Sequence, residues 1–594
     1  MVNIKVLKGC EFLILESTAA DVFIPEEFNE EQKMVAGTCK DFLKQDVLPN
    51  LKRIDEKEPG LMRSLLAKSG EMGLLGISVP EEYGGFGQSF VTSMLASDEL
   101  GAGYSFAVAF SAHTGIATLP ILYYGTEEQK QKYLPKLASG EWAGAYCLTE
   151  PNAGSDANSG RTKAVLSEDG KNYILNGQKM WITNGGFADV FTVFAKIDDD
   201  KILSAFIVER SFSGLSFNPE EKKMGIKGSS TVQVFFNDCV VPVENLLGKR
   251  GEGFRIALNI LHIGRIKLGA NVLGAGKTSI SDSVKYANER KQFGSLISNF
   301  GAIQYKMAEQ VIRQFVTESA VYRTSMYVDN TNEMYIVNGM DKVKACLVTL
   351  GEYAMEAAIL KVLGSETLDY IVDEAVQIHG GMGFSAEMNV ERAYRDARIN
   401  RIFEGTNEIN RLVVTDTLLK FAKKADSVVF NTGRLIYKQI DTLNDKASSF
   451  SDYFGKKYFY VRQLKKAVLL ILTRAYENVG NKFNTEQEIM MSISDMVIQL
   501  YAVESVVLRV EKLKAIKSAA DYSVYADICD VFVYEASCRI YKSGMDAINS
   551  FAQDDEFNKL HKGLQYFTLI EPVNIKEARR RIAAKLIADN VYKF

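Results

Sequence analysis

Proline and cysteine are scarce in this 594-residue sequence, and neither charge is in large excess. It has 10 prolines and 45 glycines, and 47% of its residues are hydrophobic, a composition typical of folded globular proteins. Its 70 basic residues nearly balance 74 acidic ones, so no polybasic surface is predicted that would bind nucleic acid or an anionic membrane by charge alone. A single hydrophobic core stops growing near roughly 250–300 residues. We therefore expect several domains, mostly helical, and no nucleic-acid partner.

The seven cysteines lie far apart, without a CxxC pair or a histidine at metal-ligand spacing. This pattern predicts a reducing compartment and no structural zinc site. The longest strongly apolar run, Ala467–Leu472, is much shorter than the roughly 20 residues of a membrane span. The expected protein is soluble, or at most peripheral to a membrane.

The period of the hydrophobic residues changes along the chain. A helical period gives way to a strand period near two, and the helical period then returns. Thr126 with Gln129 forms a capping-box pattern that predicts a helix start, and Asn176-Gly177 predicts a turn between strands. A polar break is expected near residues 423–434. The expected domains are 27–144 (helical), 145–250 (β), 251–424 (helical bundle) and 435–594 (helical).

Five short motifs combine small, hydroxyl-bearing and aromatic residues. Ala145–Asp156 and Met180–Gly186 each offer backbone N–H groups beside a hydroxyl or an indole ring, which suits a flat heteroaromatic cofactor. Taken alone, the first is equally a tight connection, and a tryptophan such as Trp181 is more commonly a core residue. Three further motifs follow in order: Arg290–Gly294, Gln377–Phe384 and Arg401–Thr406.

These motifs, in this order, resemble the signatures of the acyl-CoA dehydrogenase family. The whole chain is most similar to the very-long-chain branch, whose members carry a C-terminal helical extension; shorter members end near the position of residue 425. The resemblance implies a mainly α fold with a helical N-terminal domain, a middle β-barrel-like domain, a helical bundle and an extra C-terminal helical domain. It also implies FAD-dependent oxidation of a long-chain acyl-CoA to trans-2-enoyl-CoA in fatty acid β-oxidation, with electrons passed to an electron-transferring flavoprotein.

Two sets of flavin-binding residues follow from the resemblance. Those expected near the isoalloxazine ring are Tyr146, Leu148, Thr149, Ser155, Trp181, Ile182 and Thr183. Those expected to hold the pyrophosphate and adenine on the neighbouring subunit are Arg290, Phe293, Gln377 and Gly381. A shared site implies a homodimer, with the extension on the surface through which shorter members pair their dimers. Thr406 and Glu408 also match FAD-contacting positions, although an acidic side chain beside a pyrophosphate is unfavourable.

Glu404 is expected to be the catalytic base. Desaturation of an acyl thioester removes a weakly acidic α-proton while the β-hydrogen leaves as hydride to flavin N5. Burial against the acyl chain and the flavin would raise the pKa of a carboxylate enough for this task. Hydrogen bonds from the Glu404 N–H and a flavin hydroxyl would stabilise the developing enolate, as the resemblance implies. Outside its motif, Glu404 would be interpreted as a helix-start or surface carboxylate.

Ser155, Arg265, Phe403 and Gly405 are the residues expected to contact the acyl-CoA. Phe403 offers an apolar wall, and Gly405 allows the substrate to approach the backbone closely. Arg265 matches an arginine that family members place near the bound substrate; the alternative is a salt bridge on a helix.

Small residues shape the rest of the expected pocket. Some branches of the family place their base at the helix position of Gly264, and because glycine cannot serve, Glu404 is the only candidate. Ser111 and Ala112 would leave depth for a long acyl chain unless a bulky neighbour from elsewhere fills the space.

Three other features invite different interpretations. Gly274–Thr278 suggests a phosphate loop but lies within a helical pattern and lacks the first glycine of that motif. His379 has no catalytic partner at a suggestive spacing, so a structural role is expected. Cys147 has no triad-like surroundings and is expected to be a buried thiol.

The C-terminal segment carries no catalytic signature. Its basic residues Lys456, Lys457, Arg462, Lys465 and Lys466 flank aromatic side chains. This pattern favours a packed helix with a solvated basic face, and peripheral contact with a membrane is the alternative. The triplet Arg579–Arg581 is likewise expected to face water.

Two other functions and one location remain to be weighed. An acyl-CoA oxidase would use the same base and flavin but pass electrons to oxygen, and a flavoprotein scaffold would use the C-terminal domain as its working part. The N-terminal residues show no targeting signal. A bacterial-type cytoplasmic enzyme is expected, with a processed organellar protein as the alternative.

Overall fold

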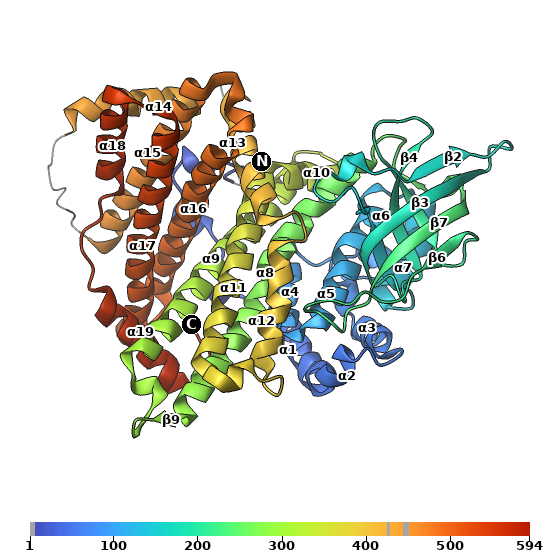
Figure 1. The fold of residues 1–594 in the computed structure, drawn as a ribbon, viewed down its shortest axis with the longest axis horizontal. Helices are drawn as coiled ribbons and strands as arrows, with labels where there is room; N and C mark the ends of the chain where they lie inside the picture. The colour runs from blue at the N-terminus through green and yellow to red at the C-terminus, as the bar shows by residue number, and fades with distance from the viewer. Residues whose placement is uncertain (1–5, 425–427, 444–449, 451) are drawn as a thin grey trace.

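The structure is a computed structural model that describes residues 6–424, 428–443, 450 and 452–594. It is mainly helical, with a β-rich region inserted between helical ones (Figure 1). The expected fold class is therefore confirmed. The predicted break near residues 423–434 is wrong over its second part, because helix α14 (Val428–Gln439) already runs through it and buries Val429 and Phe430. Residues 425–427 of that prediction lie outside the described residues.

The first helical region precedes the sheet. Its helix α7 begins at the predicted capping box: the Gln129 N–H donates to Thr126 Oγ1 at 3.3 Å, and the Thr126 N–H donates to Gln129 Oε1 at 3.0 Å. A π-helical turn, Ala112–Ala117, joins α5 to α6. Its α-helices are α1 (Glu30–Phe42), α2 (Leu51–Asp55), α3 (Leu61–Glu71), α4 (Phe90–Leu100), α5 (Ser105–Ser111), α6 (Thr118–Tyr124) and α7 (Glu127–Ser139).

The inserted sheet has strand order β6-β7-β3-β2-β4-β5-β8, and β1 pairs with β4 in parallel. The register between β3 and β7 shifts between Lys179 and Ile182. Such a bulge re-aims side chains, and Trp181 within it has a φ of 62°. The strands are β1 (Gly144–Cys147), β2 (Lys163–Leu166), β3 (Asn172–Thr183), β4 (Val190–Ile197), β5 (Ser204–Glu209), β6 (Leu215–Phe217), β7 (Thr231–Pro242) and β8 (Leu246–Leu247).

The central bundle is built around α8 and α11, which cross at two glycines. A Cβ added to Gly364 would lie 3.1 Å from the Cα of Gly269, so the two backbones approach closely. This crossing brings the side chains that precede it, Arg265 and Lys361, to the same site. The helices are α8 (Gly253–Glu289), α9 (Gly301–Val337), α10 (Lys342–Glu352), α11 (Ala354–His379), α12 (Asn389–Ala397) and α13 (Asn407–Lys424), with a short hairpin of β9 (Lys291–Gln292) and β10 (Ser295–Leu296) between α8 and α9.

The C-terminal helices pack on the outer side of α9 and α13 (Figure 1). Buried ion pairs cross this boundary: Arg323 of α9 contacts Glu504 at 2.6 Å, and Arg509 contacts Glu318 of α9 at 2.7 Å. With α14, the helices of this region are α15 (Tyr453–Val479), α16 (Gln487–Ile516), α17 (Ala519–Phe551), α18 (Asp554–Thr568) and α19 (Ile575–Asp589).

The basic residues of α15 form the expected solvated face only in part, because Arg462 is exposed and Lys456 and Lys466 are half-buried. Lys457 and Lys465 are buried and paired, with Asp530 at 2.5 Å and Glu504 at 2.6 Å respectively. Arg579 is also buried, between Glu309 and Glu535. Arg580 and Arg581 face water as expected, with side chains 51% and 58% exposed. Acidic partners on neighbouring elements therefore neutralise charges that the local pattern assigned to water.

Within the described residues, three helical segments are long and apolar enough to cross a membrane: Ser105–Tyr124, Gly253–Glu289 and Gln487–Ile516. Polar residues interrupt each one, so none contains a long uninterrupted apolar run. Their most apolar windows are 83, 67 and 78% buried inside the fold, so packing within the protein accounts for their composition.

Candidate active site

Glu404 lies in a strained turn just before α13. Its φ is 58° and that of Gly405 is 80°, a left-handed conformation that is uncommon for a residue with a side chain and occurs mainly at functional sites. Two side chains hold the turn. Asn410 Nδ2 donates to the Gly405 carbonyl at 2.8 Å, and Arg265 Nε donates to the Glu404 carbonyl at 3.3 Å.

The Glu404 carboxylate points at a gap in the surface of α8. A Cβ added to Gly264 would lie 2.7 Å from its Oε2 atom. Oε2 is buried and has no hydrogen-bond partner. Phe403 packs beside the turn, against an apolar cluster that includes Leu268 and Val372. Burial raises the pKa of Glu404 to about 7, although Arg265 and Lys361 oppose the rise.

Lys361 is the cation near Glu404 that no sequence motif indicated. It lies on α11, its side chain is fully buried, and its Nζ donates to Asn407 Oδ1 at 2.6 Å. Burial lowers the pKa of Lys361 to about 7, while the charge of Glu404 acts to raise it. The two groups therefore influence each other's protonation.

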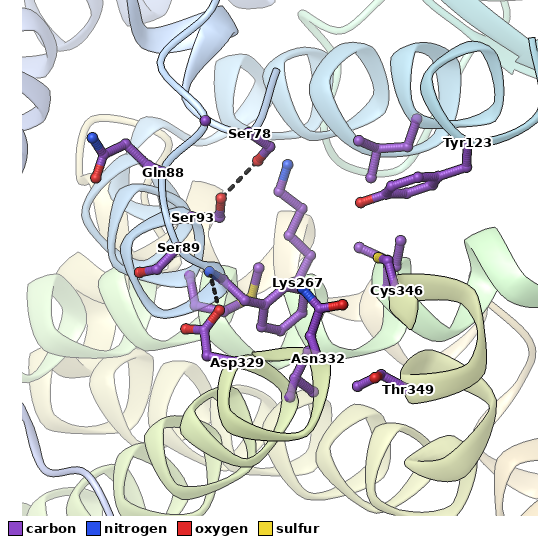
Figure 2. Close-up of a pocket in the computed structure, with 16 residues that line it drawn as sticks. Ser78, Gln88, Ser89, Ser93, Tyr123, Lys267, Asp329, Asn332, Cys346 and Thr349 are labelled. Atoms are coloured by element: carbon purple, nitrogen blue, oxygen red, sulfur yellow. Dashed lines mark hydrogen bonds between the residues drawn. The ribbon is translucent and has the colours of Figure 1, made fainter. Parts of the chain in front are cut away.

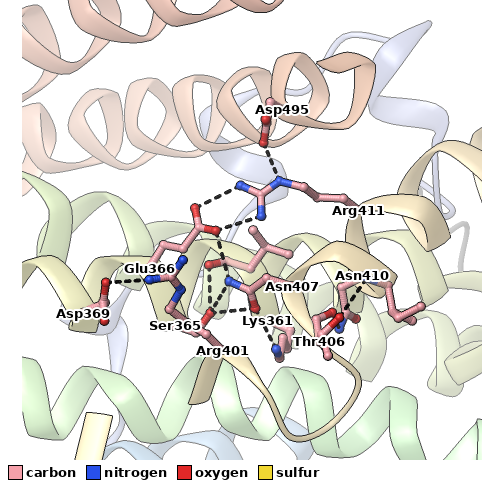
Figure 3. Close-up of polar contacts among 12 residues, drawn as sticks. Lys361, Ser365, Glu366, Asp369, Arg401, Thr406, Asn407, Asn410, Arg411 and Asp495 are labelled. Atoms are coloured by element: carbon pink, nitrogen blue, oxygen red, sulfur yellow. Dashed lines mark hydrogen bonds and ion pairs between the residues drawn. The ribbon is translucent and has the colours of Figure 1, made fainter. Parts of the chain in front are cut away.

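A polar network anchors Lys361 and the start of α13 (Figure 3). Asn407 Nδ2 donates to Glu366 Oε1 at 3.0 Å, and Arg411 grips both oxygens of the Glu366 carboxylate, at 2.8 and 3.1 Å. Arg411 Nε also donates to Asp495 of α16 at 2.8 Å. The C-terminal extension thus helps to position the turn that carries the base.

Arg265 and His262 are neighbours on α8, and Arg265 contacts the turn that carries Glu404. The alternative for Arg265, a salt bridge on its own helix, does not hold, because it reaches the Glu404 carbonyl and lies 3.5 Å from His262 Nδ1. Burial, followed by the charge of Arg265, lowers the pKa of His262 to about 3. His262 is therefore neutral near pH 7.

Tyr146 connects the β region with the base. Its hydroxyl is buried without a hydrogen-bond partner, and burial, then the charge of Glu404, raises its pKa well above the ordinary value. The backbone of Thr149 is fixed nearby, because its carbonyl accepts from the Met180 N–H at 2.8 Å. Leu148 and Ile182 bury their side chains in the protein core. The Leu148 carbonyl accepts from Lys179 Nζ at 3.1 Å, and the Ile182 carbonyl accepts from the Gly185 N–H at 3.2 Å.

The surface next to these residues fits a planar group. The Trp181 indole is 54% exposed in its bulge, Ser155 is exposed and Thr183 is half-buried. A large exposed aromatic ring held in a strained backbone conformation is costly unless a ligand covers it. Trp181, Ser155 and Thr183 therefore fit the isoalloxazine ring of FAD, and they are the residues that would hold it.

The second set of expected flavin residues lies elsewhere. Arg290 and Phe293 follow the far end of α8, and Glu289 at that end lies about 38 Å from Gly264 at 1.5 Å per helical residue. Gln377 and Gly381 lie close to them, because the His379 ring stacks on that of Tyr286 at 4.3 Å. All four are exposed, Phe293 by 95%. One chain therefore does not bring the two sets together.

Thr406 and Glu408, at the start of α13, interact mainly with the first turn of that helix. Thr406 Oγ1 accepts from the Ile409 N–H at 3.2 Å. Glu408 is exposed, and its own backbone N–H, followed by the Thr406 hydroxyl, lowers its pKa. Glu408 is therefore negatively charged at neutral pH. A negative charge beside a pyrophosphate is unfavourable.

The three other sequence features have structural roles. Lys277 of the loop-like motif lies within α8 and pairs with Asp98 and Glu318, each at 2.7 Å. The His379 Nδ1 atom contacts the Ala375 carbonyl at 2.7 Å, and Cys147 is fully buried, with its pKa raised by burial. None of these groups is placed to react with a substrate at Glu404.

Comparison with family models matches most of the chain. Acyl-CoA dehydrogenase models match residues 29–141 (N-terminal domain), 145–239 (middle domain) and 251–419 (C-terminal domain), and a further acyl-CoA dehydrogenase C-terminal domain model matches residues 463–565. The chain belongs to the acyl-CoA dehydrogenase family. The resemblance drawn from the five motifs is thus confirmed, including the extra C-terminal domain.

Individual acyl-CoA dehydrogenases align over most of their length. A probable acyl-CoA dehydrogenase of Bacillus subtilis is 44% identical over 99% of this chain and 98% of its own. The human very long-chain specific acyl-CoA dehydrogenase, a mitochondrial protein, is 38% identical over 83% of this chain and 76% of its own. An acyl-CoA dehydrogenase of Bacillus anthracis, solved in complex with FAD, has 43% identity and a TM-score of 0.96 over 99% of this chain and 100% of that one. These findings confirm FAD as the expected cofactor.

Proposed function

We propose that this acyl-CoA dehydrogenase oxidises long-chain acyl-CoA thioesters to trans-2-enoyl-CoA, with Glu404 as the base. The observation that carries the proposal is the Glu404 carboxylate: its Oε2 is buried without a partner and faces the gap at Gly264. A carboxylate held in this way is more basic than one in water.

Glu404, Arg265 and Lys361 have different roles in the first half-reaction. Glu404 takes the α-proton, and its pKa of about 7 lets it do so at neutral pH without being fully protonated beforehand. Arg265 and Lys361 keep that pKa from rising further. The Glu404 N–H donates to the thioester carbonyl and stabilises the charge that develops on it. Bound FAD supplies the acceptor for the hydride that leaves the β-carbon.

Three observations support a long-chain substrate. The chain carries the same kind of C-terminal domain as its very long-chain specific relative. Ser111 and Ala112 are small, and the Ser111 hydroxyl is buried without a partner. The test is the anaerobic bleaching of the flavin by saturated acyl-CoAs from four to twenty carbons. Bleaching that is fastest with the longer chains supports the proposal, and a maximum at four to eight carbons contradicts it.

The electron acceptor is proposed to be an electron-transferring flavoprotein. The probable acyl-CoA dehydrogenase that aligns with the whole chain supports a dehydrogenase over an oxidase. Steady-state turnover with the flavoprotein but without oxygen consumption is expected. Rapid oxygen consumption without an added acceptor would instead identify an oxidase. FAD binding without reduction by any acyl-CoA would favour the scaffold interpretation.

A homodimer is proposed to complete the cofactor site. Arg290, Phe293, Gln377 and Gly381 cluster on an exposed surface far from the base, and Phe384 beside them is 90% exposed. A large exposed aromatic patch is typical of an interaction surface. Light scattering of the FAD-loaded protein should give the mass of two chains, and replacing Phe293 with Asp should lower both the mass and the FAD content.

A further inference from the structure

A pocket of about 220 Å³ lies beside α8, and its lining includes the exposed residues Gly87 and Ser89. Helices α4, α6, α8, α9 and α10 enclose it, and polar side chains face it from several of them (Figure 2). The Lys267 side chain extends into the middle of the lining residues, with Tyr123 and Cys346 on one side and Ser78 and Ser93 on the other. Apolar side chains line the same space, among them Leu119, Ile263 and Val328.

Lys267 is a buried cation without a counter-charge. Its side chain is 6% exposed, and its Nζ donates to Thr114 Oγ1 at 2.7 Å. No ion pair involves Lys267 in the part of the chain that the structure describes. A buried ammonium group is strongly unfavourable unless it is paired. Consistent with this, burial lowers the pKa of Lys267 to about 7.

Other polar atoms of the lining also lack partners. Asn332 Oδ1 and Thr349 Oγ1 are buried without a hydrogen bond. The one carboxylate that lines the cavity, Asp329, is already engaged: it accepts from the N–H groups of Phe90 and Val91 at the start of α4, at 2.8 and 2.9 Å. The cavity therefore offers an unpaired cation together with free hydrogen-bonding groups.

The cavity begins one helical turn from the base. Ile263 and Lys267 of α8 line it, while Gly264 between them faces the Glu404 carboxylate. The rise from residue 264 to residue 267 is about 4.5 Å. The stem of Lys267 runs past Gly115, where an added Cβ would lie 3.6 Å from its Cδ. Lys267 therefore lies beside the π-helical turn that follows Ser111.

We propose that this cavity receives the distal end of the acyl chain and that Lys267 binds an anionic group there. The substrate class is then an acyl-CoA with a terminal carboxylate, that is, the monothioester of a long dicarboxylic acid. The carboxylate supplies the counter-charge that Lys267 lacks and can also accept from Thr349. The inference rests on the proposed function, and the dehydrogenation step itself is unchanged.

The test compares two substrates of the same length, hexadecanedioyl-CoA and hexadecanoyl-CoA, by the ratio of their kcat/KM values. Replacing Lys267 with Met removes the charge and keeps the length of the side chain. A hydrogen bond to a charged group contributes about 1.5–3 kcal/mol, so the dioyl/monoyl ratio should fall about 10- to 100-fold in Lys267→Met. Lys267→Gln keeps a donor for Thr114 and should show the same direction if the Met variant does not fold. FAD content serves as the measure of folding.

The outcomes separate the two proposals. A fall of tenfold or more in the ratio supports the anionic subsite. A smaller fall, or a rise, overturns it while leaving the dehydrogenase assignment intact. If neither acyl-CoA reduces the flavin of the wild-type protein, the proposed function fails, and the inference fails with it.

Discussion

The carboxylate of Glu404 occupies the space that a side chain at position 264 would fill. An added Cβ on Gly264 would lie 2.7 Å from Oε2 and 2.9 Å from the carboxyl carbon. Because Gly264 of α8 has no side chain, the Glu404 carboxylate can lie against that helix. The sequence shows that Gly264 cannot act as a base. It does not show that Gly264 makes room for the carboxylate of Glu404.

Gly264→Ala should displace the Glu404 carboxylate and slow flavin reduction by an acyl-CoA about 100-fold, because a shift of about 1 Å at a reacting group has an effect of that size. Stopped-flow absorbance of the FAD-loaded protein measures the rate. Gly351→Ala on α10 is the matched control, since nothing lies within 4 Å of a Cβ there. A wild-type rate in Gly264→Ala would show that the carboxylate is not confined against α8.

Lys361 should set the pH at which the base becomes active. In the wild-type enzyme the acid limb of kcat/KM should have its midpoint near the Glu404 pKa of about 7. Lys361→Met removes a positive charge that lowers this pKa, so the limb should move to higher pH. Lys361→Arg keeps the charge and should move it less. A limb that stays in place, or moves to lower pH, would assign Lys361 to structure alone.

The fold could be predicted from the sequence because local signals determine it, and a family motif marks the turn that carries Glu404. The change from helical to strand period marks the sheet, and Glu404 sits in a motif with Arg401 and Thr406. The burial of two lysines, Lys361 and Lys267, could not be predicted in this way. Lys361 and Lys267 are interpreted as surface residues by any local pattern, and only the packing of α8 and α11 with their neighbours buries them. The same reason explains the buried Lys457, Lys465 and Arg579.

The raised pKa of Glu404 should also appear in the stability of the protein. Its folded value, about 7, lies above the ordinary 4.5, so the folded state holds a proton that the unfolded state releases. Stability is lost as pH rises from 4.5 to 7, by about 3 kcal/mol in total. Glu404→Gln should therefore raise the Tm of the FAD-loaded protein at pH 8 and much less at pH 5.

Glu408→Gln is the control for this effect. Glu408 is exposed, and its pKa is lowered rather than raised, so its carboxylate stabilises the folded state at high pH. Its replacement should not raise the Tm at pH 8. Equal Tm changes in the two variants would contradict the claim that the charged Glu404 carboxylate destabilises the folded state at pH 8.

The rate of anaerobic flavin reduction by hexadecanoyl-CoA in Glu404→Gln tests the central claim most directly. Glutamine keeps the size of the side chain and cannot accept the α-proton, so the rate should fall about 10²- to 10⁴-fold, the range for loss of a general base. FAD content and acyl-CoA affinity should stay close to wild type. A variant that reduces its flavin within about tenfold of the wild-type rate would show that another group removes the proton.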